Sequence, residues 1–171
     1  VVRLLLKYGS DEYAKVKHEE DGTEEVISVA QYIVKEIRDD ELQFSDQVLG
    51  RIFEDYSFHI NEGIFPGDKF FVMHQDPDIS RISADLLSES HVLSKIWTVR
   101  RAWVETEDML LGELVPECVL KFKSDKIQVM IKDLKKQLTE AQESKNTDEA
   151  NDLLKQYQVL YSMLREISKS L

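Results

Sequence analysis

Cysteine is nearly missing from this chain, since Cys118 is the single cysteine among 171 residues. No internal disulfide and no thiolate metal cluster can be assembled from the chain alone, and Cys118 is most simply a small buried side chain. Long apolar runs are missing as well, so no segment of the sequence predicts a membrane span. The sequence opens directly into a helix-like segment without a secretory signal pattern, which predicts a soluble, cytoplasmic protein.

Positive charge is outnumbered: 22 Lys and Arg stand against 33 Asp and Glu, a formal net charge of −11. A protein that neutralises phosphates needs a basic surface, so we expect no direct binding of nucleic acid. Residues 121–136 form a local exception, because they hold only two acidic residues and six lysines: Lys121, Lys123, Lys126, Lys132, Lys135 and Lys136. On an acidic protein such a stripe is usually a solvated helix face, and we interpret it so.

Signatures of catalysis are also missing: there is no glycine-rich phosphate loop, no nucleophile elbow and no Cys/His arrangement. His74, Asp76 and Asp78 alternate, but alternate residues converge on a metal only in a strand, and Asp76-Pro77 instead indicates a helix N-terminus. We therefore expect no catalytic residue, metal, cofactor or small-molecule substrate. The remaining histidines are solvated or lack an evident partner: His18 beside Glu19 and Glu20, His59, and His91.

Helical periodicity dominates the first two thirds of the chain. Residues 1–8 predict the end of a helix that stops at Gly9 and begins upstream, in a fragment of a longer protein. Ser28 and Ser45 are the expected N-caps of the next two helices, and Asp76-Pro77 begins another.

Three segments depart from this helical pattern. Asp21-Gly22 predicts a tight turn between residues 13–17 and 24–28, which gives a small exposed β-hairpin near residues 13–28. Residues 88–105 fit either a short helix or an extended segment. Thr106 is the expected cap of the helix that follows, and Pro116 should kink or restart it, because its ring crowds the carbonyl of Gly112.

The last part of the chain, residues 117–171, predicts a helical hairpin. Each arm carries apolar residues at three-four spacing, the seam of a coiled coil. Ser124 interrupts the first seam, which contains Leu120, Ile127, Ile131, Leu134, Leu138 and Ala141, and the second contains Ala150, Leu153, Tyr157, Leu160, Leu164, Ile167 and Leu171. Folding the arms back antiparallel about residues 144–147, with Thr147 as N-cap, pairs these positions, for example Leu134 with Tyr157, and the two residue numbers of every pair have the same sum.

The predicted fold class is therefore all-α. Residues 1–114 form a helical bundle, and residues 115–171 form a long helix and an antiparallel hairpin. Because the seam is filled within the chain, a partner must recognise residues beside the seam, the hairpin tip at residues 145–147, or the bundle. The candidates for partner binding are large apolar side chains off the seam: Met130, Leu154, Val159, Tyr161 and Met163. Exposed apolar stripes of this kind mark protein interfaces.

Several stretches resemble the C-terminal, helicase-binding region of bacterial DNA primases of the Bacteroides group (the DnaG family). The resemblance covers essentially the whole chain, and its motifs are specific through their order and spacing. They are Leu4-Leu5-Leu6-Lys7-Tyr8-Gly9, His74-Gln75-Asp76-Pro77-Asp78-Ile79-Ser80, Asp85-Leu86-Leu87, Leu93-Ser94-Lys95-Ile96-Trp97, Val104-Glu105-Thr106-Glu107-Asp108-Met109 and Leu114-Val115-Pro116.

This resemblance implies a non-catalytic domain that docks a primase onto the hexameric replicative DNA helicase (DnaB type), with the bundle and the hairpin both in contact. The zinc-binding domain and the catalytic core of that family are absent from these residues. A generic helical-hairpin adaptor or oligomerisation domain, unrelated to replication, is the alternative. It predicts self-association, which a concentration series by light scattering would detect.

Overall fold

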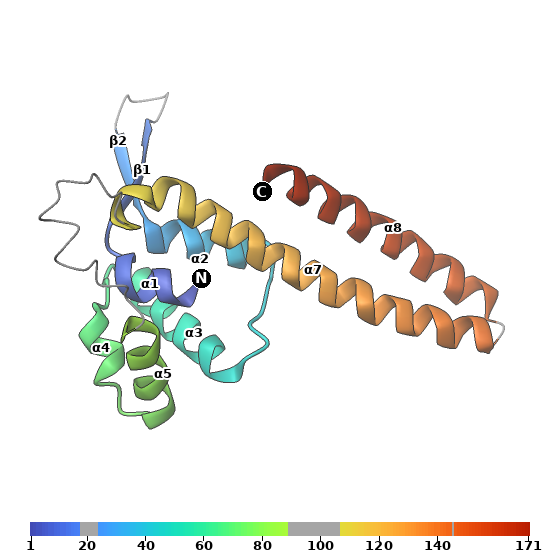
Figure 1. Cartoon of the computed structure of the whole chain (residues 1–171), viewed down its shortest axis with the longest axis horizontal. Helices are drawn as coiled ribbons and strands as arrows, with labels where there is room; N and C mark the ends of the chain where they lie inside the picture. Colours follow the sequence, from blue (N-terminus) through green and yellow to red (C-terminus); the bar gives the residue numbers. More distant parts are fainter. Residues whose placement is uncertain (18–23, 89–106, 145) are drawn as a thin grey trace, which may run out of the picture. The chain divides into compact units, whose positions relative to one another are not determined.

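The computed structural model describes residues 1–17, 24–88, 107–144 and 146–171 (Figure 1). The all-α prediction is confirmed, with one small antiparallel β-hairpin beside the helices. The chain divides into two compact units, the bundle unit Val1–Pro116 and the hairpin unit Glu117–Leu171. Some predictions lie outside the described residues: the turn at Asp21-Gly22, the roles of His18 and His91, the structure of residues 89–105 and the cap at Thr106.

Helix α1 (Val2–Tyr8) is central to the bundle unit, because it packs against α2, α3, α4 and α5. Helix α1 ends at Gly9, as predicted. Glycine is needed at this position because there is no room for a side chain beside Tyr56. Gly9 has an ordinary right-handed φ of −57°, and a Cβ on it would lie 2.0 Å from the Tyr56 hydroxyl. A side chain there would push α1 away from Tyr56. Five of the seven α1 residues are buried: Val2, Leu4, Leu5, Leu6 and Tyr8.

The predicted β-hairpin is present as β1 (Glu12–Lys17) and β2 (Glu24–Ser28), which pair antiparallel. Ser28 ends β2 and also caps α2 (Val29–Asp39), as predicted. Its hydroxyl accepts the Gln31 N–H at 3.2 Å, and the Gln31 side chain accepts the Ser28 N–H at 2.8 Å. This reciprocal capping box fixes the start of α2, whose apolar face is buried.

The described part of the bundle unit continues with three further helices, α3 (Gln47–Asn61), α4 (Asp68–Val72) and α5 (Pro77–Ser88). The predicted cap of α3 at Ser45 is wrong by one residue, because Asp46 is the N-cap. Its carboxylate accepts two backbone N–H groups, from Val48 at 2.8 Å and Leu49 at 2.9 Å. A charged acceptor that satisfies two orphan donors is a stronger cap than one hydroxyl.

The long helix α7 (Leu111–Glu143) follows a 3-10 turn, η1 (Glu107–Leu110). Of the two outcomes predicted at Pro116, a kink or a restart, the restart is wrong, because α7 runs through this residue without interruption. Pro116 lies in the second turn, so the carbonyl that loses its bond belongs to Gly112 in the first turn. Nothing lies within 4 Å of the place where a Gly112 Cβ would be, and glycine can adjust its backbone there.

A carboxylate clamp ties η1 to α1 within the bundle unit. The Tyr8 hydroxyl and the Lys7 ammonium each donate to Glu107 Oε2 at 2.8 Å. Arg3 pairs with both oxygens of the same carboxylate. Because all four side chains are at least partly shielded from water, this clamp joins parts of the chain about a hundred residues apart more firmly than an exposed pair would.

Helix α8 (Thr147–Ser170) returns antiparallel to α7 and completes the hairpin unit (Figure 1). The predicted cap at Thr147 is wrong by one residue. Asn146 accepts the Glu149 N–H at 3.4 Å and donates to the Glu149 carboxylate at 2.7 Å. Asn146 and Glu149 have the three-residue spacing of a capping box, and this pair fixes the residue at which α8 begins.

Burial along the hairpin follows the predicted seam. Ile131, Ala141 and Leu153 are buried, and most other seam residues are half-buried. Leu171 is 54% exposed, so the seam is open at its end. The Lys135 ammonium lies 5.6 Å from the centre of the Tyr157 ring, a contact that agrees with the predicted pairing of Leu134 with Tyr157.

Candidate functional site

The five candidate residues of the hairpin are all exposed, at between 39% and 57%: Met130, Leu154, Val159, Tyr161 and Met163. Their seam neighbour Leu153 is only 8% exposed, so these side chains are not part of the helix pair's own core. The structure thus separates the apolar residues that hold the hairpin together from those that face outward.

Helical geometry divides the five candidates between two faces. At 100° per residue, Leu154 and Tyr161 lie within about 20° of each other on α8, roughly 80° from the seam. Val159 and Met163 lie on the other side of the seam, and Met130 occupies that side of α7. The candidates therefore form two surfaces, and Leu154 and Tyr161 share one of them.

The bundle unit carries an aromatic patch that we define as Phe58, His59, Phe70, Met73 and His74. The His59 ring lies 4.9 Å from Phe70 and 5.7 Å from Phe58, and Phe70 lies 6.1 Å from His74, measured between ring centres. Met73 is 80% exposed. A hollow of about 480 Å³ opens beside Phe70, Met73 and His74.

The patch is attached to the core through the neighbouring ring of Phe71. Phe71 is fully buried and stacks on Tyr56 at 5.5 Å, with an angle of 3° between the rings. Phe70 meets Phe71 edge-on at 5.0 Å. Because α4 has only five residues, burying Phe71 leaves Phe70 at the surface, and a short helix supported by the core presents the patch.

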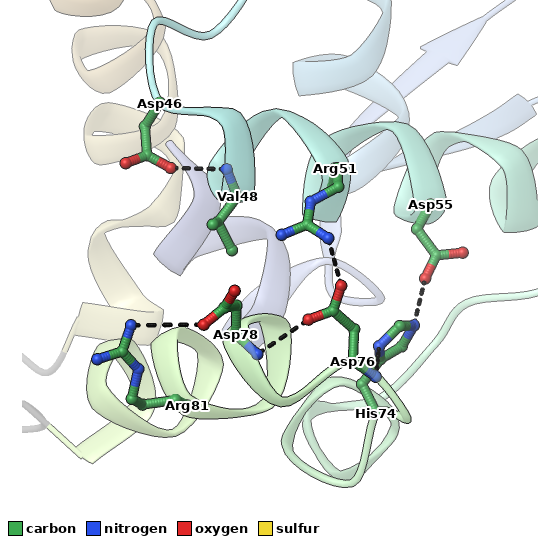
Figure 2. A network of polar contacts seen from close by, with 8 residues as sticks. All are labelled: Asp46, Val48, Arg51, Asp55, His74, Asp76, Asp78 and Arg81. Atoms are coloured by element: carbon green, nitrogen blue, oxygen red, sulfur yellow. Dashed lines mark hydrogen bonds and ion pairs between the residues drawn. The ribbon is translucent and has the colours of Figure 1, made fainter.

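A network of polar contacts holds α4 and α5 against α3 (Figure 2). The Arg51 guanidinium pairs with the Asp76 carboxylate, and Asp76 accepts the Asp78 N–H at 2.9 Å as the cap of α5. The hydrogen bond from the Asp78 backbone N–H, and secondarily the positive charge of Arg51, lower the pKa of the Asp76 carboxyl below its ordinary value. Asp76 is therefore a structural anion, and the predicted helix start at Asp76-Pro77 is confirmed.

Asp55 joins the two histidines of the patch. Its backbone carbonyl lies 2.8 Å from His59 Nδ1, and its carboxylate lies 3.3 Å from the same nitrogen and 3.3 Å from His74 Nε2. The Asp76 N–H donates to His74 Nδ1 at 3.0 Å, so in this arrangement the His74 proton is on Nε2, facing Asp55. These bonds fix both imidazole rings against Phe70.

The structure brings His74 and Asp76 together in this capping network. Within the described residues, no group of three or more His, Cys, Asp or Glu side chains is arranged to hold a metal ion. No described helix is both long and apolar enough to cross a bilayer.

Sequence reasoning did not find the aromatic patch. One available signal was the i, i+4 spacing of Asp55 and His59, which places an acceptor beside an imidazole on one helix face. Another was a run of apolar side chains around Phe70 and Phe71 that a single helical turn cannot bury completely. The partner of His74 had no signal in the sequence, because Asp55 lies on α3 and His74 lies in the link between α4 and α5.

Comparison with known proteins identifies the family of the chain. No curated protein and no solved structure matches the chain. One family model, described as Domain of unknown function (DUF8430), matches residues 1–171. The chain therefore belongs to this family across its full length.

Proposed function

We propose that this chain is the non-catalytic C-terminal domain of a bacterial DNA primase and docks that enzyme onto the hexameric replicative DNA helicase. The resemblance to primases supplies the partner. One structural observation carries the docking role: Leu154 and Tyr161 are exposed on one face of a hairpin whose seam is filled from within the chain. Exposed apolar side chains that fill no internal seam are available to a protein partner.

The aromatic patch supports the same proposal for the bundle unit. It places two phenylalanines and a methionine at the surface on a rigid base, and rigid aromatic side chains are efficient anchors in protein interfaces. Both units thus offer an apolar surface, as a partner that contacts the bundle and the hairpin requires. Primer synthesis belongs to other domains of the parent enzyme in this proposal.

A paired substitution tests the docking role of the hairpin. We expect Leu154→Ser with Tyr161→Ser to weaken co-elution with the purified replicative helicase of the same organism. Because both side chains are exposed, we expect the free energy of unfolding to fall by less than about 1 kcal/mol. Circular dichroism and thermal unfolding measure the second outcome.

The matched control is Asn151→Ser with Gln158→Ser. These residues are exposed on the same helix and have the same seven-residue spacing, but they are polar. The control should leave co-elution unchanged. A wild-type chain that does not bind the helicase would contradict the proposal, and a large loss of stability in the Leu154/Tyr161 variant would assign both residues to the core. Self-association of the chain alone would favour the adaptor.

A further inference from the structure

A groove runs between the two helices of the hairpin unit, on the face that carries Tyr161. It has a volume of about 290 Å³. We name it the Lys–Tyr groove after the residues at its edges, and its lining comes from both helices: Ile131, Lys132, Lys135, Tyr157, Tyr161 and Leu164. All of these residues belong to the hairpin unit, so the groove is complete within it.

The groove combines apolar and cationic side chains. Tyr157 and Tyr161 stack at 6.0 Å with an angle of 17° between their rings. The Lys135 ammonium lies over the Tyr157 ring, and Ile131 and Leu164 add aliphatic surface. A hollow of this size is at the lower edge of the range for small-molecule pockets, about 300–1,000 Å³, and suits one or two side chains of a larger partner.

Among the described residues, Lys132, Lys135 and Lys136 have no anionic partner, and of these three only Lys132 and Lys135 line the groove. Lys121, Lys155 and Lys169 pair with neighbouring carboxylates at 3.2, 2.9 and 2.7 Å. Within the part of the chain that the structure describes, neither Lys132 nor Lys135 forms an ion pair. Both are exposed at the rim of the groove, so their charges are available to an anion outside the unit.

We propose that the Lys–Tyr groove binds an acidic amphipathic helix of the docking partner. An apolar side chain of that helix lies against the two tyrosines, and carboxylates beside it pair with Lys132 and Lys135. This inference rests on the proposed function, because it takes the partner to be the replicative helicase. Beyond the proposed function, the inference names the binding site on the hairpin unit and the acidic, amphipathic character of the partner helix that binds there.

The spacing of the two lysines favours a helix as the occupant. Residues three apart on a helix have Cβ atoms about 5–6 Å apart, and carboxylates at i, i+3 or i, i+4 of a partner helix have the same separation. A helix laid along two others also buries a continuous apolar stripe, which suits a groove lined from both arms.

The charge balance of the molecule disfavours nucleic acid as the occupant. The bundle unit has 12 Lys and Arg against 24 Asp and Glu, a formal charge of −12. Two lysines neutralise few phosphates, and the whole chain, with a formal net charge of −11, lacks the basic surface that nucleic-acid binding requires. An acidic helix of a protein presents only the few charges that the groove can match.

Charge reversal tests the inference. We expect Lys132→Glu with Lys135→Glu to weaken binding of the full chain to the replicative helicase by at least about 10-fold, because like charges would then face each other. The neutral variant Lys132→Gln with Lys135→Gln should lose less, and it keeps the test valid if the reversed variant unfolds. Fluorescence anisotropy of the labelled chain measures binding, and wild-type binding should weaken as salt is raised.

The matched control is Lys155→Glu with Lys169→Glu, which changes the net charge equally at lysines outside the groove. Equal losses in the control and groove variants would overturn the groove inference and leave the proposed function standing. A wild-type chain that does not bind would overturn both. Binding of single-stranded DNA, or self-association of the chain, that the groove variant abolishes would assign another occupant and overturn the inference.

Discussion

The bundle unit and the hairpin unit differ in where they keep their apolar side chains. The largest fully buried side chains lie in the bundle unit, with Val119 as the exception: Tyr56, Phe71, Leu5, Ile33, Ile37, Ile52, Val29, Val115 and Val119. The hairpin unit has a single seam, and its outward faces still carry large apolar residues. The difference teaches that the bundle unit gains stability from a core, although it too exposes apolar side chains such as Phe70 and Met73, whereas the two helices of the hairpin unit share only one seam.

Charge divides in the same way. The bundle unit carries −12, whereas the hairpin unit has 10 Lys and Arg against 9 Asp and Glu, which is +1. The acidic composition of the whole chain therefore describes only the bundle. A cationic site is consistent with the hairpin unit, because no excess of negative charge surrounds it there.

The largest expected effect tests the core of the bundle unit. Phe71→Ala should lower the free energy of unfolding by about 3–5 kcal/mol, because it removes a fully buried ring that stacks on Tyr56. The adjacent Phe70 is 41% exposed, so Phe70→Ala should cost less than about 1 kcal/mol. Denaturant unfolding measures both variants. Equal costs would mean that the aromatic patch belongs to the core.

A second effect appears at high pH. Burial, and secondarily the charge of Asp11, raises the pKa of Tyr56 from 10.0 to about 12. The folded state keeps the Tyr56 proton longer than the unfolded chain, so its contribution is complete below pH 10 and is lost as the pH rises through 12. We expect stability to fall by about 2 kcal/mol across this window.

The matched variant for this pH effect is Tyr56→Phe, which keeps the ring and removes the ionisable hydroxyl. It should flatten the decline between pH 10 and pH 12 when unfolding is followed by circular dichroism. A decline of the same size in Tyr56→Phe would assign the effect to other tyrosines or lysines.

The smallest of these effects compares helix caps in the two units. Ser28→Ala should cost about 1 kcal/mol, because it removes the hydroxyl that accepts the Gln31 N–H in the buried capping box at the start of α2. Asn146→Ala should cost less, because the Asn146 cap is exposed and its bond to the Glu149 N–H is 3.4 Å long. Thermal unfolding of both variants measures the difference. A larger loss for Asn146→Ala would show that the exposed cap of α8 contributes more stability than the buried capping box of α2.

Predictions from sequence succeeded where the signal lies within a few residues. Ser28 and Gln31 belong to one helix start, Asp76-Pro77 marks another, and the seam follows from a three-four repeat. The errors were also local: the caps at Ser45 and Thr147 each had a stronger neighbour one residue away. The helix does not restart at Pro116, because the cost of a proline depends on its place in the helix, and here the carbonyl that loses its bond belongs to Gly112 in the first turn.

Side-chain pairs between distant elements had no comparable signal. Glu107 binds Arg3, Lys7 and Tyr8 across about a hundred residues, and Asp55 reaches His74 from another helix. The Lys–Tyr groove combines the basic stripe on one arm of the hairpin with two tyrosines on the other. Each residue was visible in the sequence, but its partner was not.

The order of the elements, the all-α class and the division between seam and outward faces follow from the chain alone, because backbone preferences and helical periodicity act over three or four residues. The aromatic patch, the clamp on Glu107 and the Lys–Tyr groove depend on packing, because their side chains come from different elements. The packing of those elements decides which charged side chains form ion pairs and which remain available to a partner.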